Sequence, residues 1–165
     1  MNLSDIQTLY EFNYWAKARM LSAVETLPEP DLYKDMKTSF KGIHGTLGHI
    51  CGAEDVWLQR FKGIPGAKPL KIEELPDYAA VKRKWAEVEK EMKAHVGALT
   101  EEQVQENFTF TTADGKTVPG IRWQTLQHLV NHGTYHRGQI TSLIRQLGGS
   151  PANTDLIGFY REKRS

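Results

Sequence analysis

One stretch, residues 123–148, constrains the fold more than any other part of the chain. Its apolar residues recur at helical spacing, and it ends at a glycine pair with a proline just beyond, as many helices do. Along it, His128, His132 and His136 follow one another at four-residue intervals. Four residues advance a helix by about 6 Å, so neighbouring histidines can share one ion, whereas the outer two lie about 12 Å apart. The stretch therefore predicts a long helix with a possible metal half-site, for which one pair must be chosen.

The apolar stripe of this helix helps to choose the pair. It consists of Leu126, Leu129, Val130, Ile140, Leu143, Ile144 and Leu147. At about 100° per residue, His136 lies about 50° from the centre of the stripe, His132 about 90° and His128 about 130°. His132 and His136 thus point toward the packed side, where two neutral imidazoles at this spacing can bind one cation. Histidines hydrogen-bonded to the backbone or to other helices would produce the same pattern.

Composition limits the class of protein. With 165 residues, the chain is expected to form a single domain, residues 1–165, whose core needs neither disulfides nor a metal. Its 21 basic and 20 acidic residues give no general attraction to nucleic acid or to an anionic membrane, and no basic motif suggests DNA binding. The single cysteine, Cys51, excludes an internal disulfide and fits a reducing cytoplasm. Because the N-terminus lacks a signal-peptide pattern and no apolar run approaches 18 residues, we expect a soluble cytoplasmic protein.

Three further segments have helical periodicity: residues 4–27, which begin with a Ser4–Gln7 capping pattern, residues 44–61 and residues 77–99. Residues 107–121 alternate around an Asp114-Gly115 pair, which predicts a β-hairpin, and Pro119 restricts its second arm to an edge strand. A short last element is expected near residues 156–160. The predicted fold is therefore all-α: a four-helix bundle with a small β-hairpin insertion before the last long helix.

Polar residues on the other predicted helices are candidates for a site. Glu54 lies within the apolar stripe of residues 44–61, so it should be paired, hydrogen-bonded or used to orient a metal-bound histidine. Asn13, on the apolar face of the first helix, needs hydrogen-bond partners for the same reason. His49 lies about 130° from the stripe centre, on a secondary face with Ala53 and Val56. Periodicity alone predicts an ordinary surface or half-buried histidine there.

Three segments together carry a resemblance to a known family. They are FNYWAKARML, GTLGHICGAEDVWLQRF and HLVNHGTYHRGQITSLIRQLGGSP, one in each of the first, second and last long helices. In combination they resemble the DinB/YfiT-like helical-bundle proteins, a family of metal-dependent enzymes, over nearly the whole chain. The family has one metal-binding histidine on the second helix and two on the last. The resemblance thus implies His49, His132 and His136 as ligands, which replaces the periodicity interpretation of His49.

The resemblance also suggests a chemistry. Three neutral histidines leave a coordination position open to water or substrate, as in catalytic sites, and zinc or nickel suits imidazole nitrogen. Some members are similar to thiol-dependent transferases or maleylpyruvate isomerase-like enzymes, which implies a small-molecule substrate such as a low-molecular-weight thiol. The catalytic candidates are Glu54, Tyr135, Arg137 and Gln139.

Two functions remain open from the sequence. The first is a metal-dependent transferase or hydrolase that activates a thiol or water. The second is a non-catalytic stress-response protein that binds a metal or a small ligand. A homodimer is expected, because family members are often dimeric and because Phe159 and Tyr160 offer apolar surface beyond the bundle.

Overall fold

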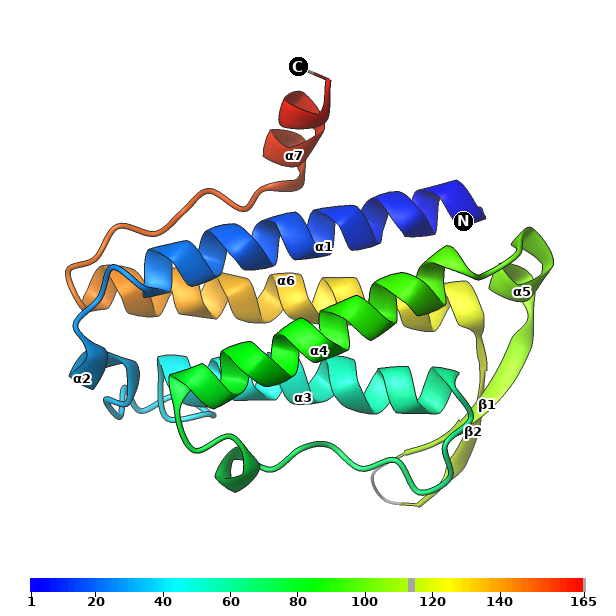
Figure 1. The fold of residues 1–165 in the computed structure, drawn as a ribbon, viewed down its shortest axis with the longest axis horizontal. Coiled ribbons are helices and arrows are strands. Elements are labelled where there is room, and N and C mark those ends of the chain that lie inside the picture. Colours follow the sequence, from blue (N-terminus) through cyan, green and yellow to red (C-terminus); the bar gives the residue numbers. More distant parts are fainter. Residues whose placement is uncertain (113–114, 165) are drawn as a thin grey trace.

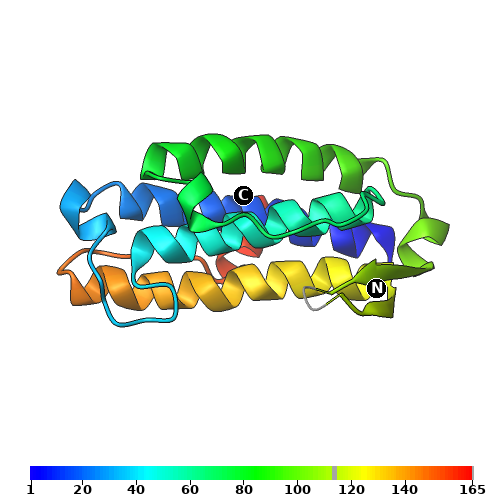
Figure 2. The same cartoon turned by 90° about the horizontal axis from the view of Figure 1, so that it is seen from below.

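Four long helices lie side by side in the computed structural model, which describes residues 1–112 and 115–164 (Figure 1). They are α1 (Leu3–Val24), α3 (Ile43–Phe61), α4 (Tyr78–Gly97) and α6 (Arg122–Gln146). Both α1 and α3 pack against α4 and against α6. Seen from below, α4 and α6 lie on opposite sides, with α1 and α3 between them (Figure 2). The predicted all-α fold is therefore confirmed.

The core fills the space between these helices. The stripe predicted for α6 is buried, except that Leu147 is only partly so. The helix ends as its glycine pair predicts: Gly148 adopts a left-handed φ of 79°, and the Gly149 N–H donates to the Ile144 carbonyl at 2.9 Å. The predicted capping residue of α1 is wrong by two positions. Asn2, not Ser4, caps this helix, because its side chain accepts from the Asp5 N–H at 2.8 Å.

The predicted hairpin is also present, directly before α6. Strands β1 (Asn107–Thr111) and β2 (Thr117–Ile121) pair antiparallel, with Pro119 opposite Thr109. Of the predicted turn pair, Asp114 lies outside the described residues, and Gly115 has a φ of 83°. The hairpin extends past the end of α3, so it can cover one face of that helix (Figure 1).

Short helices lie in the connections between the long ones: α2 (Glu29–Leu32), the 3-10 helix η1 (Ile72–Glu74) and α5 (Glu101–Gln105). Another short helix, α7 (Leu156–Lys163), follows α6. Residues 27–42 contain two prolines and mixed charges, a pattern that suggests a connection rather than a helix interior. The short α2 nevertheless forms there, because Pro30 lies in its first turn, where a missing N–H costs nothing. In the described part of the chain, no helix combines the length and the apolar character needed to cross a membrane.

The last helix, α7, packs against the outer side of α1 (Figure 1). Phe159 is only 6% exposed there, with its ring 5.9 Å from that of Phe12 and 5.8 Å from that of Trp15. The expectation that Phe159 offers free apolar surface beyond the bundle is therefore wrong. The exposed apolar side chains of α7 are instead Leu156 and Ile157.

Candidate metal centre

His49 on α3 and His132 and His136 on α6 come together where these two helices pack. Their potential ligand nitrogens all lie within 4.8 Å of one another, and the three side chains could hold a metal ion. The rings of His132 and His136 are 4.5 Å apart between centroids, and those of His49 and His136 are 4.6 Å apart. The structure thus brings together the three histidines that the family resemblance implies.

Two of the ligand nitrogens, Nε2 of His49 and Nε2 of His132, lie 3.0 Å apart. Two nitrogens bound to one zinc ion at 2.0–2.1 Å would lie about 3.3 Å apart. A hydrogen bond between two imidazoles would give about 2.9 Å. The distance fits both arrangements, but a hydrogen-bonded pair does not account for a third ring, that of His136, at the same point. The cluster of three is what favours a cation.

The orientation of His136 is fixed by a neighbour one turn along α6. Its Nδ1 lies 2.8 Å from Oε1 of Gln139. Because a carbonyl oxygen can only accept, Nδ1 carries the proton in this arrangement, and Nε2 keeps a free lone pair. Within the described residues, Nδ1 of His132 is buried without a hydrogen-bond partner, which is costly and more usual where a side chain is held for function.

Burial also favours the neutral form of two of the rings. Together with the smaller effect of the nearby His136, it lowers the pKa of both His49 and His132 to about 4. A charged imidazole is disfavoured in this partly desolvated position. At neutral pH these rings are therefore neutral, which is the form that binds metals.

Phe40 covers one side of the cluster. Its ring stacks on that of His49, with centroids 3.9 Å apart and planes inclined by 16°, and it meets His136 edge-on at 5.6 Å. The loop that carries Phe40 can approach α3 because residue 45 is a glycine. A Cβ on Gly45 would lie only 2.0 Å from the Phe40 carbonyl oxygen. Sequence reasoning missed Phe40, since it lies in a segment that reads as a simple connection.

The four catalytic candidates fall into two groups. Gln139 contacts His136, as described above, and the ring of Tyr135 packs edge-on against His136 at 4.9 Å while its side chain is 65% exposed. Glu54 and Arg137, by contrast, are each 2% exposed within the core. Tyr135 and Gln139 thus contact the histidine cluster, whereas Glu54 and Arg137 lie in the core.

Glu54 is the centre of a buried hydrogen-bond network. Its carboxylate accepts from Asn13 Nδ2 at 2.9 Å, from Trp85 Nε1 at 3.0 Å and from the Tyr14 hydroxyl at 3.2 Å. Burial raises the pKa of Glu54, and the hydrogen bonds from Asn13 and Trp85 partly oppose this. The network joins α1, α3 and α4, and it provides the partners that both Glu54 and Asn13 were expected to need.

Arg137 extends this network to α6. It donates to Asn13 Oδ1 at 2.8 Å and to Thr134 Oγ1 at 2.7 Å. Gly133 leaves the room for the first of these bonds: a Cβ there would lie 3.0 Å from Nη1 of Arg137 and 3.2 Å from Asn13 Oδ1. The bond to Asn13 joins α6 to α1, and the bond to Thr134, within α6, orients the guanidinium. A direct catalytic role for Glu54 or Arg137 stays a prediction.

The remaining candidates lie outside the cluster. His128 is exposed, with its ring 6.2 Å from that of His132 and edge-on to Trp57 at 5.9 Å. His44 packs against Tyr33, at 5.0 Å between ring centroids. Cys51 is buried, and burial raises its pKa to about 12, so it is a neutral thiol rather than a thiolate ligand.

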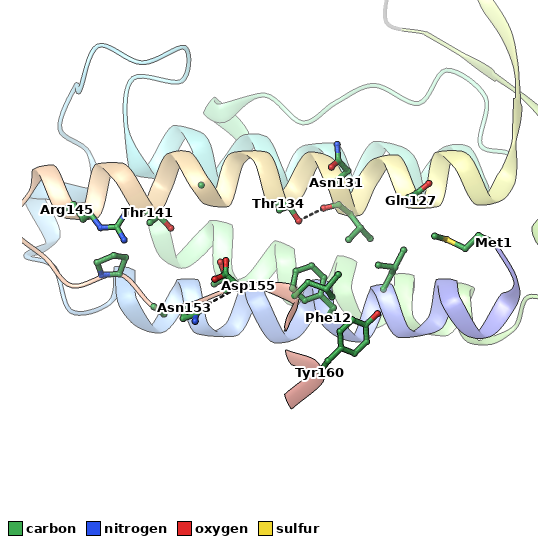
Figure 3. A pocket seen from close by; sticks show the side chains of 17 residues that line it. Met1, Phe12, Gln127, Asn131, Thr134, Thr141, Arg145, Asn153, Asp155 and Tyr160 are labelled. Atoms are coloured by element: carbon green, nitrogen blue, oxygen red, sulfur yellow. Dashed lines mark hydrogen bonds between the residues drawn. The ribbon is translucent and has the colours of Figure 1, made fainter. Parts of the chain in front are cut away.

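One large cavity lies away from the cluster. It has a volume of about 940 Å³ and lies between α1, α6 and residues 151–160, where Phe12, Asn131, Thr134 and Tyr160 line it (Figure 3). A smaller cavity, of about 350 Å³, includes His49 in its lining. Cavity size and ligand chemistry thus point to different places, because the smaller cavity, not the larger one, is lined by a histidine of the cluster.

Comparison with known proteins agrees with this arrangement. The sequence model of the DinB family matches residues 1–164. The chain is also 30% identical over 162 residues to a curated relative, Protein DinB of Bacillus subtilis (strain 168), in an alignment that covers 92% of this chain and 91% of that protein. A bundle with its histidines converging from α3 and α6, together with these matches, leads to one conclusion: the chain belongs to the DinB family.

Proposed function

We propose that the protein is a cytoplasmic metal-dependent enzyme of a single domain, in which His49, His132 and His136 hold a divalent ion, zinc or nickel. The observation that carries the proposal is the convergence of three imidazoles from two helices, with ligand nitrogens within 4.8 Å of one another. The reaction would be transfer to, or hydrolysis of, a small-molecule substrate, with a low-molecular-weight thiol or water as the activated group. An ion held by three protein ligands lowers the pKa of a water or thiol bound to it.

The residues around the triad have distinct parts in this proposal. Gln139 holds His136 in the tautomer whose Nε2 lone pair is free. Phe40 keeps water from one side of His49 and His136, which strengthens electrostatic interactions inside the site. Tyr135, exposed beside His136, has a hydroxyl that can donate a hydrogen bond to a bound substrate.

A second function is favoured by a different observation. Glu54 and Arg137, the charged catalytic candidates, direct their hydrogen bonds into the core network rather than toward the histidine rings. A site without a positioned acid or base suits a non-catalytic stress-response protein that binds a metal or a small ligand. Turnover of a thiol substrate by zinc-loaded protein would favour the enzyme, and stoichiometric binding without turnover would favour the second function.

Metal content tests the ligand set. Wild-type protein loaded with zinc and then desalted should retain one ion per chain. His49→Ala, His132→Ala and His136→Ala each delete one ligand and should lower the retained zinc sharply, with circular dichroism showing that the helices persist. His128→Ala is the matched control on the same helix and should retain zinc as the wild type does. Full retention in the His136 variant, or equal loss in all four, would contradict this ligand set.

We also propose a homodimer. Support comes from the exposed apolar side chains Leu156 and Ile157 on α7 and from the large open cavity beside them, of about 940 Å³. Tyr160 lines the same cavity. Sedimentation at micromolar concentration should give a mass of two chains, and a monomer under these conditions would remove the proposal.

A further inference from the structure

The cavity of about 350 Å³ that adjoins His49 has a well-defined floor on α3. His49, Val56 and Arg60 all line it, and His49 and Arg60 are eleven residues apart in the sequence. Eleven residues make three turns with a remainder of about 20°, so both lie on one face of the helix. They are separated by about 16 Å along the axis. The cavity therefore runs along α3 from the histidine cluster to Arg60.

The walls of this cavity are mainly apolar. Leu70 forms one side, and its backbone nitrogen would lie 3.5 Å from a Cβ at Gly52, so the segment packs closely on the helix. Trp57 and Phe110 form the other side, with ring centroids 4.8 Å apart. A volume of 350 Å³ is at the small end of the range for ligand pockets. The shape suits a small molecule with an apolar body.

Among the described residues of this lining, Arg60 is the one with a formal charge. Its guanidinium lies 4.8 Å from the Trp57 ring centre and 5.7 Å from that of Phe110. Its Nε is buried and, among the described residues, has no hydrogen-bond partner. Burial also lowers its pKa, so the cation is partly desolvated. Arg60 lies near the C-terminus of α3, where a cation interacts favourably with the helix dipole. That interaction does not explain why its Nε is buried without a partner or why no described carboxylate pairs with it.

We propose that this cavity binds a small organic carboxylate, with the carboxylate on the Arg60 guanidinium, the apolar body between Leu70 and Phe110, and the opposite end at His49. The planar guanidinium offers two parallel donors that match one carboxylate. A phosphate fits less well, because the site lies near the negative C-terminal end of α3. The second negative charge of the phosphate would have no partner there. A small carboxylate would then be the substrate class of the proposed metal centre. Any reaction at the His49 end rests on that centre, whereas binding of the carboxylate at Arg60 does not.

A pair of probes that differ in charge alone tests the proposal. The probes are 4-phenylbutyrate and its neutral amide, 4-phenylbutanamide, titrated into the full chain and followed by the NMR shift of the Trp57 indole N–H. The measurement is made on zinc-loaded and on metal-free protein, because a carboxylate can also bind zinc directly. In both forms the acid should bind at least about tenfold more tightly than the amide, as a charge-assisted hydrogen-bonded pair implies.

In metal-free protein, Arg60→Gln should remove this preference, so that acid and amide bind with the same affinity, and the variant should still retain zinc when loaded. Arg19→Gln is the matched control, since Arg19 also lies 4.8 Å from a tryptophan ring, that of Trp15 on α1, and it should keep the preference. Equal binding of both probes to wild-type protein, binding of neither, or a preference that survives Arg60→Gln in metal-free protein would overturn the proposal. Failure of zinc binding with the preference intact would instead sink the metal centre and leave the carboxylate site standing.

Discussion

Gly133 gives the sharpest test of how the histidine-bearing helix is held. A helical glycine is normally less favourable than alanine by about 0.5–1 kcal/mol, so Gly→Ala usually stabilises a helix. Gly138, in the same helix, follows that rule, because a Cβ there would have no atom within 4 Å. At Gly133 the Cβ would lie 3.0 Å from Arg137 Nη1 and 3.2 Å from Asn13 Oδ1. The same substitution should therefore have opposite effects at the two positions.

The expected magnitude at Gly133 follows from the bond that the methyl group displaces. Arg137 Nη1 and Asn13 Oδ1 are 2.8 Å apart. Because Arg137 is only 2% exposed, its guanidinium has little room to move. Losing a hydrogen bond to a buried charged group costs about 1.5–3 kcal/mol, against a gain of up to about 1 kcal/mol in helix propensity. Gly133→Ala should lower the free energy of unfolding by about 1–2 kcal/mol, whereas Gly138→Ala should raise it by about 0.5–1 kcal/mol.

Urea unfolding of the metal-free protein, followed by circular dichroism, measures both values. Metal-free protein is used so that zinc binding does not contribute to stability. All three histidines are retained in both variants. If Gly133→Ala stabilises the protein as much as Gly138→Ala does, the network through Arg137 and Asn13 does not hold α6, and the reasoning is refuted.

Three further outcomes are expected. Gln139→Leu should weaken zinc affinity about 10- to 100-fold in a chelator competition. Gln139→Glu keeps an acceptor for His136 Nδ1 and should bind zinc as the wild type does. Equal zinc affinity in the two variants would show that Gln139 does not orient His136. The metal-free protein should lose stability as the pH falls from about 6.5 to 4. The pKa values of His49 and His132 are about 4 in the folded protein, so the unfolded chain takes up more protons over this range. His132→Ala should reduce the pH dependence of the urea midpoint. Cys51, buried with its pKa raised to about 12, should react with an aromatic disulfide reagent at pH 8 only after unfolding, and rapid labelling of folded protein would contradict its burial.

The long helices could be predicted because their periodicity records burial directly. The stripe of α6 was found from residue spacing alone, and the positions of His132 and His136 relative to it match their half-buried and buried states. Glu54 and Asn13 could be predicted to need partners, since polar groups on apolar faces are rarely left unpaired. Their actual partners come from helices distant in sequence, so no local pattern could identify them.

His49 shows where periodicity fails. The main stripe of α3 faces the other long helices, but a second face, with His49, Val56 and Arg60, is covered by Leu70 and Phe110. These covering residues lie in a loop and in the hairpin, whose positions depend on the packed fold rather than on the sequence of α3. The angle from the main stripe matches the half-buried state of His49 but could not show that His132 and His136 lie beside its ring. Only the family resemblance indicated its role.

Phe40 was missed for a related reason. It reaches His49 through a loop that depends on Gly45 having no side chain, and a glycine next to a helix start is too common to predict such a contact. Gly133 is similar: a glycine within a helix reads as a weak point until Arg137 and Asn13 are seen beside it. Close approaches of this kind follow from packing, which the sequence encodes only through the whole fold.

Anomalous diffraction from crystals of the zinc-loaded protein, collected on both sides of the zinc absorption edge, tests the proposed metal centre most directly. We expect one strong peak per chain between α3 and α6, about 2.0–2.1 Å from a ring nitrogen of each of His49, His132 and His136. His128 should have no contact with the peak. A peak bound by other residues, or a His49 ring turned away while His132 and His136 bind the ion with a different third ligand, would contradict the proposed site.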